Sequence, residues 1–138
     1  MRKGLMGMVA GVMLATSVMA QEAVAPVPGI EAVISGQMRA FEGDDFETAF
    51  DYASPGIQGM FRSADNFGAM VQRGYPMVWR HDDVQFGDLR DVEGVLWQRV
   101  FVTDPGGTVH ALDYRMEQID GDWRIAGVQI ARLPGVSA

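Results

Sequence analysis

The spacing of apolar residues changes near Met77, and this change constrains the fold more than any other feature of the sequence. Before it, apolar residues recur every three or four positions, which is typical of amphipathic helices. After it, apolar and polar residues alternate and are interrupted by Gly, Asp and Pro, which is typical of strands joined by tight turns. Helices in the first half and strands in the second predict a single α+β domain.

Boundary signals predict four helical segments in the first half. Proline is favoured in the first turn, Ser and Asp are favoured as N-caps, and glycine is favoured where a helix ends. We expect the buried stripes of these helices, rich in Phe, Ile and Met, to form the core. The signals are Pro28 and Gly43, a capping box of Asp44 with Glu47, Ser54-Pro55, and Ser63 with Gly74.

The second half is predicted to form a four-stranded antiparallel meander, and its turns set the register. Residues 104–107 fit a three-residue hairpin loop, which places Gln98 opposite Tyr114. Residues 120–121 fit a type I′ turn, which places Gly127 opposite the same tyrosine. The strands are expected near residues 77–90, 94–103, 108–118 and 122–131.

Two charged pairs support these registers independently of the turns. The registers place Arg99 opposite Asp113, and Glu117 opposite Arg124. Opposite charges that face each other across two strands are a favoured pairing, and a slip of one residue would separate both pairs. The sheet is therefore expected to have one mainly apolar face, covered by the helices, and one face with charges.

Four polar side chains are predicted on the helix-facing side of the sheet, namely Gln98, His110, Tyr114 and Gln129. They are pocket candidates, because a few convergent polar groups in an apolar cavity are typical of a ligand site. Gly127, which has no side chain, is expected to leave room beside Tyr114. The alternative is a filled core, in which Gln98 and Tyr114 bond to each other or to helix ends. For His110 the alternative is a half-exposed structural role.

Large apolar side chains interrupt the charges on the opposite face, where Trp97, Phe101, Val128 and Ile130 are predicted to lie. Monomers rarely leave such a patch exposed in one place. We therefore expect a homodimer through the sheet, with the flanking charged pairs at its rim. The alternative is a C-terminal tail from Leu133 that folds over the patch.

Residues 1–20 are expected to be a secretory signal peptide, which makes the protein periplasmic or secreted. Arg2 and Lys3 precede an apolar run, and Val18-Met19-Ala20 fits a cleavage site. The run is shorter than the roughly 20 apolar residues of a membrane span. The alternative to a cleaved signal peptide is an uncleaved N-terminal anchor. Residues 21–28 are then expected to be a linker, 29–133 the domain and 134–138 a tail.

Composition excludes several classes of chemistry from the mature chain. Cleavage would leave nine arginines against eighteen acidic residues, so neither nucleic acid nor an anionic membrane is expected as a partner. The absence of cysteine excludes disulfides and thiolate chemistry, and the only lysine, Lys3, would be removed. With only His81 and His110 present, a multi-histidine metal site is not expected. We expect no metal and no cofactor.

Several short motifs carry a family resemblance. The helices followed by an antiparallel meander resemble the cone-shaped nuclear transport factor 2-like (SnoaL-like) superfamily, and the motifs resemble an exported branch of it, the domain of unknown function 4864. The resemblance covers roughly residues 30–130 and implies helices packed on the concave face of a curved, cone-like sheet. The motifs are Ala53-Ser54-Pro55, Ile57-Gln58, Met70-Val71, Tyr75-Pro76, Tyr114-x-Met116 and Asp120-Gly121-x-Trp123-Arg124-Ile125-x-Gly127-Val128.

The resemblance leaves two functions open, because this superfamily contains both enzymes and non-catalytic binding domains. Its proton-transfer enzymes, such as ketosteroid isomerases, pair an acidic base with a tyrosine donor, a role that Tyr114 fits. No acid is predicted on the helix-facing side of the last three strands, and Asp88 is expected to have a turn or surface role. We expect a non-catalytic domain that binds a small apolar ligand or a protein partner. The alternative is a small lyase, isomerase or hydrolase that uses Tyr114 and Gln98.

Overall fold

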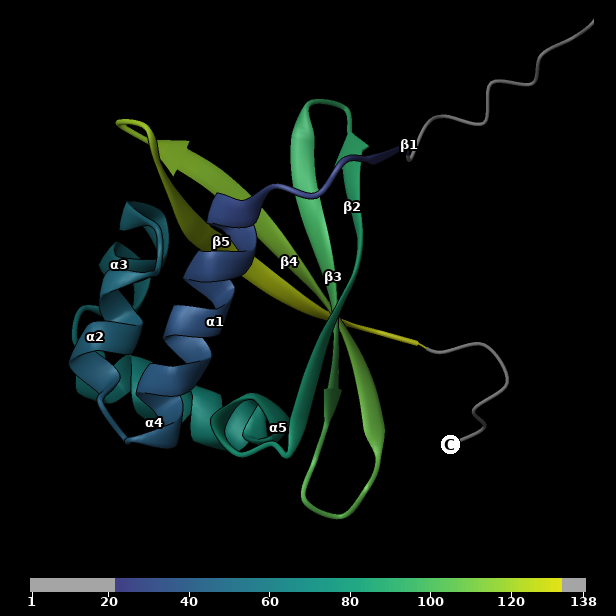
Figure 1. Cartoon of the computed structure of the whole chain (residues 1–138). Helices are drawn as coiled ribbons and strands as arrows, with labels where there is room; N and C mark the ends of the chain where they lie inside the picture. Colours follow the sequence, from purple (N-terminus) through teal and green to yellow (C-terminus); the bar gives the residue numbers. More distant parts are fainter. Residues whose placement is uncertain (1–21, 133–138) are drawn as a thin grey trace, which may run out of the picture.

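Helices lie on one side of a twisted antiparallel sheet, as the change of spacing along the sequence predicts (Figure 1). This computed structural model describes residues 22–132. The predicted signal peptide and the tail at 134–138 lie outside the described residues. Within residues 22–132, no helix is long and apolar enough to cross a membrane.

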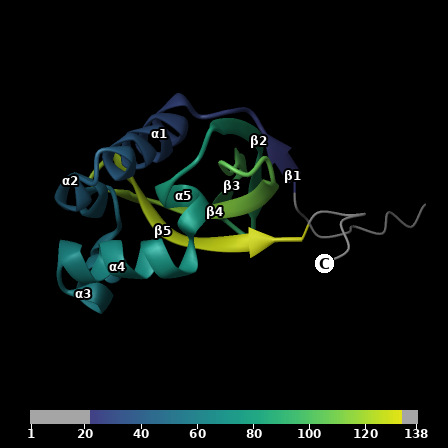
Figure 2. The same cartoon turned by 90° about the horizontal axis from the view of Figure 1, so that it is seen from below.

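Three helices in the first half of the chain begin at a proline, a residue suited to the first turn of a helix. Ser54 and Ser63 cap two helices as predicted, since their hydroxyls accept hydrogen bonds from the backbone N–H groups of Ile57 and Asn66. Figure 2 shows the helices gathered over one face of the sheet. The helices are α1 (Pro28–Glu42), α2 (Phe46–Asp51), α3 (Pro55–Phe61), α4 (Ala64–Gly74) and α5 (Pro76–Trp79).

The predicted capping box at Asp44 is wrong, because Asp44 is part of the motif that ends α1. Asp44 adopts a left-handed conformation with φ 55°, and its N–H donates to the carbonyl of Phe41 at 3.0 Å. The N–H of Asp45 donates to Ala40 at 2.8 Å, which completes a Schellman motif. The N-cap of α2 therefore moves to Asp45, whose carboxylate accepts from the N–H of Thr48 at 3.2 Å.

The sheet has five antiparallel strands in sequence order, one more than predicted. The additional edge strand pairs Glu22–Val24 with Leu89, Arg90 and Asp91, in the segment predicted to be a linker. The first predicted strand begins later than expected, because Pro76 starts the one-turn helix α5. The strands are β1 (Glu22–Val24), β2 (Asp83–Val92), β3 (Val95–Thr103), β4 (Val109–Ile119) and β5 (Asp122–Ala131). The sheet is twisted but not strongly curled, unlike the predicted cone (Figures 1 and 2).

The predicted register of β3 with β4 is confirmed. Gln98 lies opposite Tyr114, and Arg99 lies opposite Asp113. The Arg99 guanidinium donates to both carboxylate oxygens of Asp113, with Nη2 at 3.0 Å from Oδ2. This two-point contact fixes the register from the solvent-facing side of the sheet.

The predicted register of β4 with β5 holds near the turn and then fails at a β-bulge. Glu117 lies opposite Arg124 as predicted. Between Ile125 and Gly127, however, β5 carries an additional residue, Ala126, so Tyr114 faces Val128 instead of Gly127. A bulge of one residue turns every later side chain of the strand to the other face.

The core fills the space between the helices and the sheet around a cluster of phenylalanines. Phe67 of α4 has its ring centroid 5.9 Å from that of Phe41, 5.3 Å from that of Phe50 and 5.8 Å from that of Phe61. Contacts between tilted or offset rings at these distances each stabilise the fold by roughly 0.5–1.5 kcal/mol beyond area burial. The cluster holds α1, α2, α3 and α4 together above the sheet.

Candidate functional site

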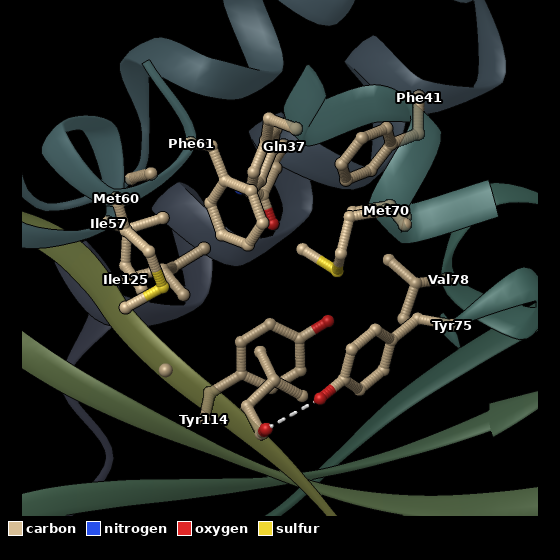
Figure 3. Close-up of a pocket in the computed structure, with 15 residues that line it drawn as sticks. Gln37, Phe41, Ile57, Met60, Phe61, Met70, Tyr75, Val78, Tyr114 and Ile125 are labelled. Carbon is tan, nitrogen blue, oxygen red and sulfur yellow. Dashed lines mark hydrogen bonds between the residues drawn. The ribbon is translucent and has the colours of Figure 1, made fainter. Parts of the chain in front are cut away.

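The helices do not fill the space above β4 and β5 completely, and a cavity of about 240 Å³ remains beside the phenylalanine cluster (Figure 3). Its wall is mainly apolar and aromatic. Among the described residues that line it, none carries an acidic or basic side chain. The lining residues are Gln37, Phe41, Ala53, Ile57, Met60, Phe61, Phe67, Met70, Val71, Tyr75, Val78, Tyr114, Ile125, Gly127 and Val128.

Tyr114 of β4 is the predicted pocket residue that does line this cavity. Its side chain is fully buried, and its hydroxyl has no hydrogen-bond partner among the described residues. Figure 3 shows this hydroxyl pointing into the cavity. Burial, with a smaller contribution from Tyr75, raises the pKa of Tyr114 well above its usual range, so the hydroxyl remains protonated at neutral pH.

Tyr75, between α4 and α5, lines the same cavity but its hydroxyl is already paired. The hydroxyl donates to the backbone carbonyl of Val128 at 3.0 Å, the dashed line in Figure 3. This bond joins the end of α4 to β5 just after the bulge. Two tyrosines thus face one cavity, and only Tyr114 keeps a free hydroxyl proton.

Gln37 of α1 is a third polar residue of the wall, and it is not among the four pocket candidates predicted from the sequence. Its side chain is buried, and its Nε2 donates to the carbonyl of Ala49 at 3.1 Å. The amide oxygen remains, and in Figure 3 it points toward the cavity. A signal for this residue exists in the sequence, since Gln37 stands three residues after Ile34 and four before Phe41 on an apolar helical stripe.

Gln98 does not line the cavity, and it does not bond to Tyr114. Its Nε2 donates to the carbonyls of Gly87 and Arg99, both at 2.9 Å. Gly87 lies in a second irregularity of the sheet, between Phe86 and Leu89 of β2. The amide nitrogen of Gln98 therefore pairs with the Gly87 carbonyl at this irregularity, which is a structural role, while its Oε1 is buried without a partner among the described residues.

The other two pocket candidates lie elsewhere. His110 forms a pair with Asp104 at 2.8 Å in the β3–β4 hairpin, which agrees with the half-exposed alternative. This hydrogen bond lowers the pKa of Asp104. Gln129 is exposed and lies opposite Asp113 on the far side of the sheet, because the bulge at Ala126 reverses its direction. The prediction that Gln129 faces the helices is wrong.

Gly127 contributes to the cavity in a different way from the one predicted. It lies opposite Arg115, and a Cβ built on it would approach the Cβ of Arg115 at 3.9 Å, on the face away from the helices. Its backbone lines the cavity, but its missing side chain opens no space there. The space beside Tyr114 is instead bordered by Val128, which was predicted on the opposite face.

The face of the sheet away from the helices keeps only part of the predicted apolar patch. Trp97 and Phe101 lie on it and are half-buried. Val128 lines the cavity, and Ile130 lies opposite Leu112 on the helix-facing side with 55% of its surface exposed. The bulge has removed both residues from the predicted dimer face.

Charged groups in the described part of the chain form pairs away from the cavity. Arg80 donates to both carboxylate oxygens of Asp44 at 3.0 and 3.1 Å, and His81 lies 3.0 Å from Glu42. These pairs connect the end of α1 to the segment after α5. Among residues 22–132, no group of three or more His, Asp or Glu side chains is arranged to hold a metal ion.

Comparisons with known proteins place the chain in one family. No curated protein and no solved structure matches it. The sequence profile of one family, described as a domain of unknown function (DUF4864), matches residues 25–138. This match begins just after β1 and covers the five helices and strands β2 to β5 of the described chain, and so includes every residue that lines the cavity. The chain therefore belongs to the family of the domain of unknown function DUF4864.

Proposed function

We propose that this domain is a non-catalytic binding domain that holds a small, mainly apolar molecule in the cavity between the helices and the sheet. The observation that carries the proposal is the Tyr114 hydroxyl, which is fully buried, unpartnered among the described residues and aimed into that cavity. A buried polar group without a partner costs roughly 1–3 kcal/mol. A bound ligand that pairs with the hydroxyl removes this cost.

The cavity favours binding over acid–base catalysis. An enzyme of the kind considered above needs a carboxylate beside Tyr114, and the described residues of the wall include no Asp or Glu. Gln98, the other proposed catalytic residue, bonds to the Gly87 and Arg99 carbonyls instead. A cavity with apolar walls and a few polar groups is the usual form of a small-molecule site.

The order of elements supports membership of the nuclear transport factor 2-like superfamily, which the family resemblance implied. Helices precede an antiparallel meander and pack on one of its faces. The basic start, apolar run and Val18-Met19-Ala20 support export to the periplasm or beyond. Protein recovered after export is expected to begin at Gln21 when its intact mass is measured.

A homodimer through the sheet remains part of the proposal, on a smaller face than the sequence indicated. Trp97 and Phe101 lie on either side of the Arg99–Asp113 pair, on the face that the helices leave uncovered. An aromatic centre with charged groups around it fits the composition of protein interfaces.

A titration with toluene tests the binding proposal. We expect toluene to shift the amide NMR signals of cavity residues, as small apolar molecules enter apolar cavities of this size. Val128→Phe places a larger side chain in the cavity and is expected to abolish the shifts. The matched control is Val109→Phe, at a 47% exposed position outside the cavity wall, which should leave them unchanged. Shifts that persist in Val128→Phe, or their complete absence in the wild type, would contradict the proposal.

A further inference from the structure

The polar groups of the cavity wall are few, and most of their hydrogen-bonding capacity is already used. Tyr75 donates its only hydroxyl proton to Val128, and Gln37 donates through Nε2 to Ala49. The hydroxyl of Tyr114 remains as a donor without a partner among the described residues, and the amide oxygen of Gln37 can accept a hydrogen bond. In Figure 3 both point into the same cavity from opposite walls, one from the sheet and one from α1. One donor facing one acceptor suits a ligand group that both accepts and donates.

A charged ligand does not fit this wall. The described lining residues include no Arg, Lys, His, Asp or Glu, so a buried carboxylate, phosphate or ammonium would have no counter-charge. Burying an unpaired charge is far more costly than burying a hydroxyl group. The ionised pairs of the described chain, such as Arg99 with Asp113, lie on other surfaces. The ligand is therefore uncharged.

The remainder of the wall favours an aromatic ring of limited size. Five of its residues are aromatic, and two methionines add polarisable sulfur atoms, which contact ring edges favourably. A cavity of 150 Å³ accommodates benzene. By the same proportion, the present 240 Å³ accommodates roughly ten non-hydrogen atoms. This is the size of a single substituted ring.

We propose that the cavity binds a small uncharged phenol, whose hydroxyl accepts a hydrogen bond from Tyr114 and donates one to the amide oxygen of Gln37. This inference rests on the proposed binding function and specifies the ligand class for the same site. It assigns Tyr114 and Gln37 as the residues that determine specificity. The phenylalanines and methionines contribute affinity that the ligand shares with any ring of similar size.

Four probes of nearly equal size separate the contributions, with binding to the purified protein followed by NMR at pH 7. Phenol both accepts and donates, anisole only accepts, toluene does neither, and benzoate is an anion. We expect phenol to bind most tightly, anisole less tightly and toluene least tightly, with phenol at least about tenfold tighter than toluene, since each satisfied buried hydrogen bond contributes about 1 kcal/mol and phenol forms two. Benzoate is expected not to bind.

The variant Tyr114→Phe is expected to bring the affinities of anisole and toluene to within about twofold of each other, because the free donor is gone, and to leave phenol only the part of its advantage that the bond to Gln37 contributes. The control Tyr52→Phe removes a tyrosine hydroxyl outside the cavity wall and should preserve the full difference. The wild-type series of four probes is decisive even if Tyr114→Phe does not fold.

The outcomes distinguish the ligand class from the binding function. Binding of toluene and phenol with equal affinity, or binding of benzoate as tightly as phenol, would overturn the ligand class and leave the binding function standing. Failure of all four probes to bind would overturn the binding function itself. An advantage of anisole over toluene that survives in Tyr114→Phe would overturn the assignment of Tyr114, because another group would then donate to the ligand oxygen.

Discussion

The two tyrosines of the cavity are expected to respond in opposite directions to the loss of the hydroxyl. Tyr114→Phe removes a hydroxyl that is fully buried and has no partner among the described residues, whereas Tyr75→Phe removes a hydroxyl that donates to Val128 at 3.0 Å. Both substitutions keep the ring, so neither creates a large cavity. The comparison therefore isolates the effect of one hydrogen bond.

The magnitudes follow from the partners of each hydroxyl. A neutral hydrogen bond contributes about 1 kcal/mol net, so Tyr75→Phe is expected to lower the free energy of unfolding by roughly that amount. An unpartnered buried hydroxyl costs roughly 1–3 kcal/mol, so Tyr114→Phe is expected to raise it by about 1 kcal/mol or more. The two variants should differ by at least about 2 kcal/mol, which exceeds the uncertainty of a comparison of denaturation midpoints.

Urea unfolding of the ligand-free protein at pH 7 measures this difference, with the slope of each transition checked for equality. A stability loss in Tyr114→Phe as large as that in Tyr75→Phe would refute the reasoning, because it would mean that the Tyr114 hydroxyl is satisfied. A gain in stability would identify Tyr114 as a residue that is retained despite its cost to folding. Such a cost is typical of a functional site.

Three further predictions concern the fold and the surface. The burial of Tyr114 should make stability depend on pH under alkaline conditions. Below pH 10 its hydroxyl is neutral in both the folded and the unfolded chain, but above pH 10 it ionises only in the unfolded chain, because burial raises its pKa in the folded protein. The free energy of unfolding therefore falls by up to about 1.4 kcal/mol per pH unit. Urea midpoints between pH 9 and 11 should therefore fall less in Tyr114→Phe than in the wild type. Gly87→Ala should lower stability by about 1–3 kcal/mol in thermal unfolding, because its Cβ would lie 2.8 Å from the Phe101 ring, whereas Gly59→Ala, with no such neighbour, should not. Trp97→Glu should convert the proposed dimer into a folded monomer in sedimentation experiments, and a wild type that is already monomeric at high concentration would contradict that proposal.

The elements that the sequence predicted correctly depend on local signals. Ser54 and Ser63 cap their helices through hydrogen bonds to N–H groups three residues later, so the signal lies within a few residues of the sequence. The β3–β4 register follows from a turn and from the charges of Arg99 and Asp113, which are independent constraints. The same two signals agree for Glu117 and Arg124, and there the register holds only as far as the bulge.

The features that the sequence predicts wrongly depend on contacts between residues distant in the sequence or on a single irregularity. The strand Glu22–Val24 is three residues long and exists through its pairing with β2, so no local pattern indicates it. Aspartate is a favoured N-cap residue, but Asp44 takes part in the Schellman motif at the end of α1 and so does not cap α2. Gly127, next to the bulge at Ala126, signals an irregular strand, but it does not indicate which residue is the additional one. Propagating an ideal register through the bulge therefore misplaces every residue beyond it.

That one bulge also decides the chemistry of the cavity. In the regular ladder predicted from the turn, Gln129 would face the helices with its amide, and Val128 would face away from them. The additional residue reverses both, so that an apolar side chain borders Tyr114 and the exposed side of the sheet receives the amide. The Val128 carbonyl, just beyond the bulge, accepts the hydroxyl proton of Tyr75. Tyr114 is thereby left as the one tyrosine of the described wall with a free hydroxyl proton, opposite Gln37, and the proposed preference for an uncharged hydroxyl-bearing ligand depends on the position of Ala126.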